Sequence, residues 1–231
     1  MPLPILETPN YELILPSTGK KIKYRPFLVK EYKILLTTME AESKEISRIV
    51  TELVDNCTFK KLDIDKLASF DIEYLFLNIR ARSISETTDI IINCDCGEKI
   101  DYAMDLTKVE VDKPTGIENK IMLTENIGVV MRYPRFDEIL DIYENANSDK
   151  ILSLVGNCID AVYTKTEYFD KSTYSEKELD DFVSSFSKKQ FDLLEKFFEK
   201  LPRIIHHIEA DCPACGKKNT VDLEGLQNFF V

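Results

Sequence analysis

The 231-residue sequence has no tryptophan, only 7 glycines and only 2 histidines. The scattered glycines form neither a phosphate-binding loop, nor a dinucleotide-binding fingerprint, nor a Gly-x-Ser-x-Gly elbow. A catalytic site that used histidine would have to be built on His206 or His207, which are adjacent. We therefore expect a protein that is not an enzyme, and we identify no catalytic residue.

Positive charge and long apolar runs are also scarce. The chain has 30 Lys and Arg against 41 Asp and Glu, a net charge of −11, which argues against non-specific binding to nucleic acid or anionic lipid. Its apolar runs, such as residues 27–29 and 90–92, are far shorter than the roughly 18 residues that cross a bilayer. We expect no membrane-spanning segment, no secretory signal and a reducing cytoplasmic environment.

The first part of the chain predicts a hairpin followed by helices. Alternating apolar residues indicate strands at 11–15 and 21–24, and residues 16–20 have the composition of a turn. Helical spacing then predicts three helices, over 29–41, from Ser43 onward, and from Asp63 or Asp65 to Arg82.

The second part returns to strands and then to helices. We expect strands within 88–106, a loop at 107–120 and a hairpin at 121–133. Apolar stripes predict helices at 136–144 and 150–163, and capping-box spacing predicts two more that begin after Ser175 and Ser187.

Four of the 6 cysteines form two tight pairs, Cys94-Asp95-Cys96-Gly97 and Cys212-Pro213-Ala214-Cys215-Gly216. Each pair follows an apolar stretch and precedes a polar one, so that a strand–knuckle–strand pattern occurs twice. Two knuckles supply four sulfurs, which is the number that tetrahedral zinc binds, and thiols stay reduced in the cytoplasm. We predict a structural Zn²⁺ held by Cys94, Cys96, Cys212 and Cys215.

Two alternatives to this zinc site remain open in the sequence. His206 or His207 could replace one thiolate, because both precede the second knuckle, or the knuckles could bind no metal at all. The first pair, Cys-x-Cys, is also shorter than the common two-residue spacing. Cys57 and Cys158 lie alone within helical patterns and are read as small buried hydrophobic residues.

The pattern predicts an α+β protein that is mainly helical, with small antiparallel β hairpins and a split zinc-ribbon-like module. We expect four parts: an N-terminal β hairpin at 1–27, a helical segment at 28–87, the split module at 88–106 plus 204–231, and a β-hairpin and helical insertion at 107–203.

Several long motifs resemble one protein family. Residues 8–13, 15–20 and 24–31 are similar to the opening of the T4-like phage baseplate hub proteins, as are residues 67–74 and 80–83. Both knuckles and residues 222–230 fit as well, and the resemblance is weakest over 107–200. The family contains hub subunits and a related hub-assembly factor, and the resemblance does not separate the two.

The resemblance implies a non-enzymatic structural or assembly protein of a contractile-tailed phage, located in the tail baseplate of the virion and in the host cytoplasm during assembly. It implies other hub proteins as partners, the tape-measure protein as a further one, and an oligomeric assembly. Two other readings are a transient zinc-stabilised chaperone that is absent from the mature virion, and a metal-dependent enzyme.

Two segments have the composition of a partner surface. The basic and aromatic turn contains Tyr24, Arg25 and Phe27, and arginine and aromatic residues are enriched at protein interfaces. The apolar chain end, with Leu226, Phe229 and Phe230, needs cover from this protein or from another.

Overall fold

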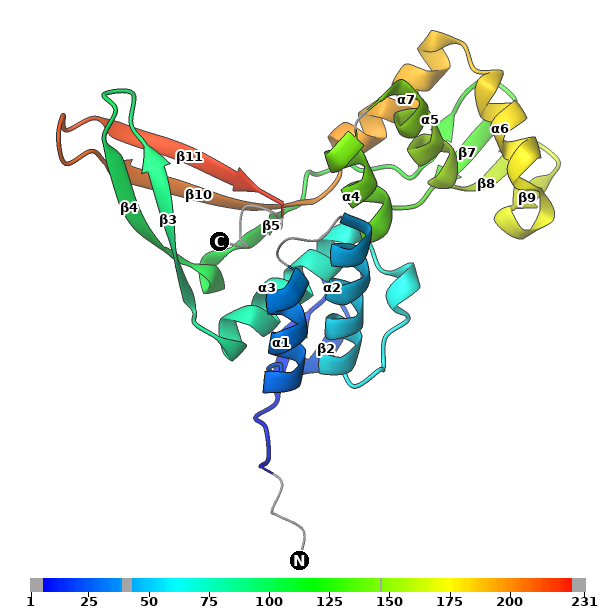
Figure 1. The fold of residues 1–231 in the computed structure, drawn as a ribbon. Helices are drawn as coiled ribbons and strands as arrows, with labels where there is room; N and C mark the ends of the chain where they lie inside the picture. The colour runs from blue at the N-terminus through cyan, green and yellow to red at the C-terminus, as the bar shows by residue number, and fades with distance from the viewer. Residues whose placement is uncertain (1–5, 39–42, 146, 226–231) are drawn as a thin grey trace, which may run out of the picture. The chain divides into compact units, whose positions relative to one another are not determined.

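The computed structural model describes residues 6–38, 43–145 and 147–225 (Figure 1). The chain divides into two compact units. Unit 1 contains Met1–Asp112 together with Arg203–Val231, and unit 2 contains Lys113–Pro202. The C-terminal strands therefore pack with the N-terminal half of the chain, which places both cysteine knuckles in unit 1.

Unit 1 begins with an antiparallel hairpin and three helices. Strands β1 (Tyr11–Ile14) and β2 (Lys21–Tyr24) pair with each other, and helices α1 (Val29–Thr38), α2 (Ser43–Cys57) and α3 (Ser69–Ser83) follow. Helix α3 is buried around most of its circumference, and its fully buried side chains include Ile72, Leu75, Phe76, Leu77 and Ile79. A helix of this kind forms the centre of a core rather than its edge.

The rest of unit 1 consists of two small sheets. Strands β3 (Thr87–Asn93) and β4 (Lys99–Asp105) form one hairpin, and β10 (Arg203–Asp211) and β11 (Lys218–Glu224) form another, with β5 (Glu110–Asp112) on the free edge of β10. Burial alternates along β3 and β10, so that one face of each strand packs inward. The loops of the two hairpins lie at the same end (Figure 1).

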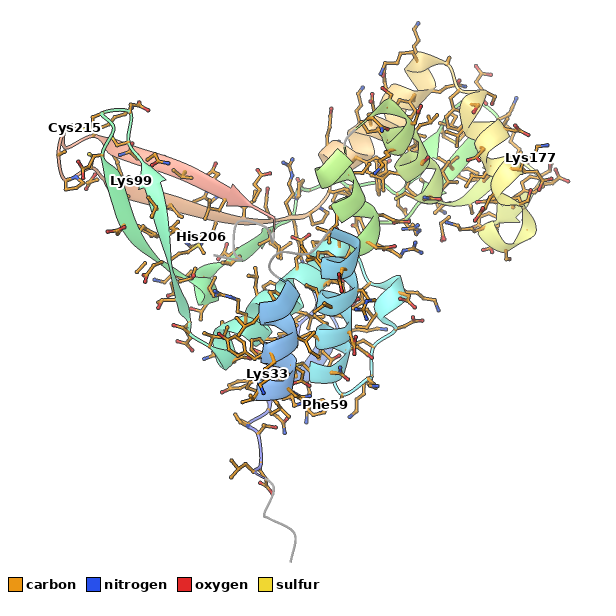
Figure 2. The ribbon with its side chains drawn as sticks, in the orientation of Figure 1. Lys33, Phe59, Lys99, Lys177, His206 and Cys215 are labelled. Atoms are coloured by element: carbon orange, nitrogen blue, oxygen red, sulfur yellow. The ribbon has the colours of Figure 1, made fainter. Side chains whose placement is uncertain are left out.

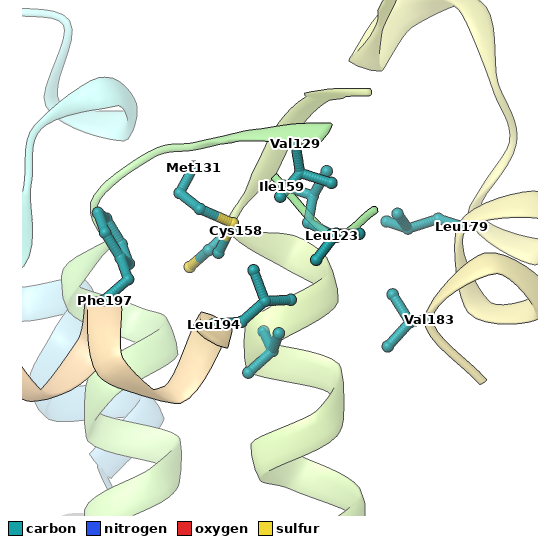
Figure 3. Packing of buried hydrophobic residues seen from close by; sticks show 10 residues of the cluster. Leu123, Val129, Met131, Cys158, Ile159, Leu179, Val183, Leu194 and Phe197 are labelled. Atoms are coloured by element: carbon teal, nitrogen blue, oxygen red, sulfur yellow. The ribbon is translucent and has the colours of Figure 1, made fainter. Parts of the chain in front are cut away.

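Unit 2 has a four-stranded antiparallel sheet and four helices. The sheet order is β6 (Lys120–Met122), β7 (Ile127–Met131), β8 (Ile159–Thr164) and β9 (Tyr168–Asp170). The helices are α4 (Phe136–Asn145), α5 (Ser148–Asn157), α6 (Glu176–Ser184) and α7 (Lys188–Glu199). Figure 3 shows the side chains of Met131, Cys158, Ile159 and Leu194 close together in the core of this unit.

Three short 3₁₀ turns complete the secondary structure of the described ranges. They are Ile64–Lys66 before α3, Leu106–Lys108 after β4, and Lys171–Thr173 after β9. No helix in the described part of the chain is both long and apolar enough to cross a membrane.

Both predicted capping boxes are confirmed. The Ser175 hydroxyl accepts from the Glu178 amide, and the Glu178 carboxylate accepts in return from the Ser175 amide at the start of α6. Ser187 and Gln190 make the same reciprocal pair at the start of α7. Each box satisfies two amide groups that a helix N-terminus would otherwise leave without partners.

The expectation of a mainly helical protein is wrong. The described residues are 40% helical, and 28% lie in strands of four small antiparallel sheets, so the structure is α+β without a helical majority. Part of the difference is the predicted helix at 150–163, which is split: α5 ends at Asn157 and β8 begins at Ile159. A short apolar run looks alike in a buried strand and in a buried helix, so its periodicity did not separate the two.

The predicted loop at 107–120 also contains a strand. Residues Glu110–Asp112 form β5, which pairs antiparallel with Arg203–Ile205 of β10. A strand of only three residues is too short to show an alternating pattern in the sequence, and its pairing partner, β10, is distant in the sequence.

Candidate metal centre

The four cysteines of the two knuckles come together. Cys94 and Cys96 lie in the loop between β3 and β4, and Cys212 and Cys215 lie in the loop between β10 and β11. The four sulfur atoms all lie within 4.8 Å of one another. Figure 2 shows Cys215 at the tip of its hairpin.

The sulfur–sulfur distances suit a shared metal ion. The Cys94 and Cys215 sulfurs are 3.8 Å apart, and the Cys96 and Cys212 sulfurs are 3.6 Å apart. A tetrahedral Zn²⁺ with zinc–sulfur bonds of about 2.3 Å places its sulfurs about 3.8 Å apart. A disulfide requires about 2.05 Å, and all four cysteines are free thiols.

Each knuckle is a tight turn closed by the same backbone hydrogen bonds. In the first, the Cys94 amide donates to the Glu98 carbonyl at 2.9 Å, and the Gly97 amide donates to the Cys94 carbonyl at 2.9 Å. In the second, the Cys212 amide donates to the Lys217 carbonyl and the Gly216 amide to the Cys212 carbonyl, both at 2.9 Å.

Glycine is required where each knuckle turns back. Gly97 has φ +89° and Gly216 has φ +72°, which is the left-handed region that residues with a Cβ rarely adopt. The glycine that follows each cysteine pair in the sequence therefore has a direct conformational reason.

The electrostatics of the cluster favour a bound cation. The backbone amide of Cys96 donates to the Cys94 sulfur, and this lowers the pKa of the Cys94 thiol to about 7. The Glu98 amide acts in the same direction on Cys96, but the three neighbouring thiols outweigh it and raise the pKa of Cys96 to about 12. Four thiolates this close together repel one another unless a divalent ion compensates their charge.

One half of the cluster is buried and the other half is exposed. Cys94 and Cys212 are 5% and 3% exposed, whereas Cys96 and Cys215 lie at the surface. The side chains of Lys217 and Asp95 form an ion pair from one knuckle to the other beside the sulfurs. The donor set consists of four soft sulfur ligands on rigid turns, and this composition fits Zn²⁺.

Histidine is absent from the described cluster. His206 is buried on β10, away from the knuckle (Figure 2), and burial lowers its pKa. His207 is exposed, and its Nδ1 lies 2.6 Å from Asp222 Oδ1 on the neighbouring strand. The alternative in which one histidine replaces a thiolate is therefore not supported by the geometry.

The two lone cysteines are buried, as the sequence predicts. Cys57 and Cys158 are both 0% exposed, and burial raises the pKa of each thiol to about 12.

The structure places the proposed N-terminal partner residues inside unit 1. Tyr24 and Phe27 are 3% and 8% exposed, and the Arg25 guanidinium forms a bidentate pair with Glu31. These side chains serve the core in this conformation and do not form an exposed partner surface. Leu226, Phe229 and Phe230 lie outside the described residues.

Residues 8–231 match the protein family described as T4 bacteriophage base plate protein. No curated protein and no solved structure matched the chain in the corresponding comparisons. The family match extends over both knuckles and almost the whole sequence, and it confirms the resemblance at the level of a phage baseplate protein. The chain therefore belongs to the T4 bacteriophage base plate protein family.

Proposed function

We propose that this chain is a non-enzymatic structural or assembly protein of the baseplate hub of a contractile-tailed phage. The observation that carries this proposal is the family match over residues 8–231. In this proposal the protein binds other hub proteins. It assembles in the host cytoplasm and is located in the tail baseplate of the virion.

The same proposal includes a structural Zn²⁺ held by Cys94, Cys96, Cys212 and Cys215. Its support is the set of four sulfurs within 4.8 Å, with tetrahedral edge lengths. Four protein ligands fill a tetrahedral ion, so that no position remains for a water molecule or a substrate. The ion would hold the C-terminal hairpin to the middle of the chain and contribute directly to folding.

The partner proposal is tested by co-expressing the full chain with the other tail proteins of its phage. We expect a stable complex with at least one hub protein after affinity purification and size-exclusion chromatography. A chain that elutes alone in every combination contradicts the hub role. The tape-measure protein is included as a separate combination, because it is the second partner class that we propose.

Mass spectrometry of purified mature phage particles decides between a permanent and a transient role. Peptides from this chain at a fixed ratio to other baseplate proteins support a structural subunit. Their absence from mature particles, together with their presence in assembly intermediates, supports an assembly chaperone instead.

The metal proposal has its own test with a matched control. We expect zinc to co-purify with the full chain, and Co²⁺ substitution to give the absorption of a four-thiolate site. The double variant C96S/C215S removes two exposed ligands and should lose the metal. H207N changes an exposed side chain on β10 outside the cluster and should keep it; equal metal content in these two variants contradicts the assigned ligands.

A further inference from the structure

The two units contain the same buried arginine site. Arg25 directly follows strand β2, and Arg132 directly follows strand β7, the second strand of a hairpin in each unit. In both places a glutamate lies six residues further on, as Glu31 and Glu138, in the first turn of a 10-residue helix. The order of hairpin, arginine and helix is therefore the same in unit 1 and in unit 2.

The hydrogen bonds of the two sites agree one by one. The Nη2–Oε1 distance is 2.7 Å in both ion pairs, and the Nη1–Oε2 distance is 3.0 Å for Arg25–Glu31 and 2.9 Å for Arg132–Glu138. Nη1 also donates to the carbonyl of the residue that follows the arginine, at 2.9 Å in unit 1 and 3.0 Å in unit 2. Three hydrogen bonds of each arginine side chain therefore have the same donor atoms and equivalent acceptor atoms in the two units.

The same glutamates begin their helices in the same way. Glu31 Oε2 accepts from the Leu28 amide at 2.6 Å, and Glu138 Oε2 accepts from the Arg135 amide at 2.8 Å. In both cases the donor is the residue just before the helix, which is one half of a capping box.

The lone cysteines occupy equivalent places. The Arg25 amide donates to the Cys57 carbonyl at 3.0 Å, and the Arg132 amide donates to the Cys158 carbonyl at 2.8 Å. Cys57 is the last residue of α2 and Cys158 directly follows α5, and each closes the same sequence, Leu-Val-x-Asn-Cys, at residues 53–57 and 154–158. Sequence and geometry therefore repeat together.

The knuckle hairpins complete the correspondence. The first follows helix α3 and the second follows helix α7. Each hairpin has seven paired positions before its loop, from Thr87–Asp105 to Asn93–Lys99 in the first and from Ile205–Glu224 to Asp211–Lys218 in the second. The second loop is one residue longer, which accounts for Cys-x-x-Cys in place of Cys-x-Cys.

We infer that the chain consists of two tandem copies of one module, approximately residues 11–105 and 120–224, and that the four-cysteine centre joins the equivalent hairpins of the two copies. The second copy also contains strands β8 and β9 and one additional helix, α6, which have no counterpart in the first. Its hairpin packs within unit 1, whereas the rest of the copy forms unit 2.

The sulfur contacts have the pattern of a twofold joint. Cys94 contacts Cys215, and Cys96 contacts Cys212, so the first cysteine of each knuckle meets the second cysteine of the other. If the two hairpins are interchanged, the Cys94–Cys215 contact takes the place of the Cys96–Cys212 contact. The same equivalence is found in the isologous interface of a symmetric dimer. The surface that a module hairpin fits is therefore the hairpin of another copy of the same module.

A cleavable full-length chain tests this inference. A site-specific protease sequence is inserted into residues 113–119, between β5 and β6, where a cut leaves one module in each fragment. We expect the cut protein to elute as one complex while metal is bound, and to dissociate into two fragments at a higher protein concentration after chelation, when the pairing of β5 with β10 still links the fragments. Hydrogen exchange should show that each separated fragment keeps its arginine site, at Arg25 or at Arg132, protected.

Each result of this experiment has a defined meaning. Fragments that separate with the metal bound, or that dissociate no more readily once the metal is gone, overturn the metal centre as the joint. A fragment that loses all amide protection on separation overturns the independent module. Without chelator, C96S/C215S in the cleavable chain should dissociate as readily as the chelated parent, and H207N should behave like the metal-bound parent.

The joint rests on the proposed metal site, and the two can fail separately. Metal content of the intact chain decides the zinc proposal before any cut is made. The duplication is read from hydrogen exchange of E31Q and E138Q in the intact chain, where each substitution should deprotect its own hairpin and helix pair to a similar degree. Deprotection in only one of the two variants would contradict equivalent modules.

Discussion

In the ion pairs Arg25–Glu31 and Arg132–Glu138, each glutamate both pairs with its arginine and accepts a hydrogen bond from the residue before its helix. The side chains of Glu31 and Glu138 are 5% and 7% exposed, whereas those of Arg25 and Arg132 are 13% and 22% exposed. A bidentate guanidinium–carboxylate contact is among the stronger polar interactions in proteins, and loss of one partner leaves a buried charge without compensation.

We predict that E138Q destabilises unit 2. Glutamine keeps an oxygen that can accept from the Arg135 amide, but it removes the charge that faces Arg132. The free energy of unfolding should fall by about 3 kcal/mol, measured by urea denaturation. E52Q, which removes the carboxylate of the exposed Arg48–Glu52 pair on α2, is the control and should leave the midpoint nearly unchanged; equal losses in both variants would contradict a special role for the buried pair.

The same glutamates predict how stability depends on pH. Burial by itself raises the pKa of Glu138, but hydrogen bonds from Arg132 and from the Arg135 amide outweigh it, so the pKa lies below its usual value. The pKa of Glu31 is lowered in the same way by Arg25 and the Leu28 amide. Their stabilisation is therefore fully present above about pH 4.3, the usual value for unfolded glutamate, and is lost as pH falls through the folded-state pKa.

Urea titrations at pH 7, 5, 4 and 3 check this sign. We expect parent stability to hold from pH 7 to 5 and to fall below pH 4, and the double variant E31Q/E138Q to show a shallower fall. A parallel decline in the parent and the double variant would show that other carboxylates cause the acid sensitivity.

A functional residue can be predicted from the sequence where the spacing of the residues around it is typical of one kind of site. Two cysteine pairs, each followed by glycine, predict the cluster that the structure forms. The composition of the turn with Tyr24, Arg25 and Phe27 predicts a partner surface, but Tyr24 and Phe27 are buried, because a basic and aromatic turn has the same composition whether or not the fold covers it. Burial at these positions depends on contacts with distant partners, among them Cys57 and Ser83, which local pattern does not contain.

Helix boundaries in unit 2 are determined by local hydrogen bonds, and so they could be predicted well. Ser175 and Ser187 each close a capping box within four residues. The end of α5 could not be predicted in this way, because Ile159 leaves the helix to pair with Met131 of β7. Pairing with β7 therefore replaces the helix after Asn157. The apolar pattern within the 14 residues 150–163 does not show this, because β7 lies outside that range.

We predict that S187A destabilises α7 without unfolding the protein. Alanine removes the acceptor for the Gln190 amide, and loss of an N-cap side chain costs about 1 kcal/mol. Urea denaturation should show this loss, and hydrogen exchange should show faster opening of the first turn of α7. S187D restores an acceptor and should recover most of the stability, whereas S187D that is as unstable as S187A would contradict the capping explanation.

At the scale of the whole molecule, the chain is not folded in the order of its sequence. The C-terminal strands β10 and β11 follow unit 2 in the sequence but belong to unit 1, where they pack beside β3 and β4, and β5 pairs with β10. This arrangement could be expected from the cysteine pairs alone, since only a return of the tail brings the four sulfurs together. The internal repetition, by contrast, is confined to short stretches of sequence such as residues 53–57 and 154–158, and the matching contacts are needed to extend it to a whole module.

Removal of the metal should affect the stability of the two units differently. All four cysteines belong to unit 1, so chelation should lower the unfolding temperature of unit 1 and leave that of unit 2 largely in place. For a unit of this size, a loss of about 1 kcal/mol shifts the unfolding temperature by about 4 °C, which calorimetry resolves. L194A, which opens a cavity at a fully buried position of unit 2, should do the reverse, with a loss of about 3 kcal/mol from unit 2 and unchanged metal content. If chelation and L194A shifted the same transition, the two units would unfold as one, and the metal would stabilise the whole chain rather than the joint between its hairpins.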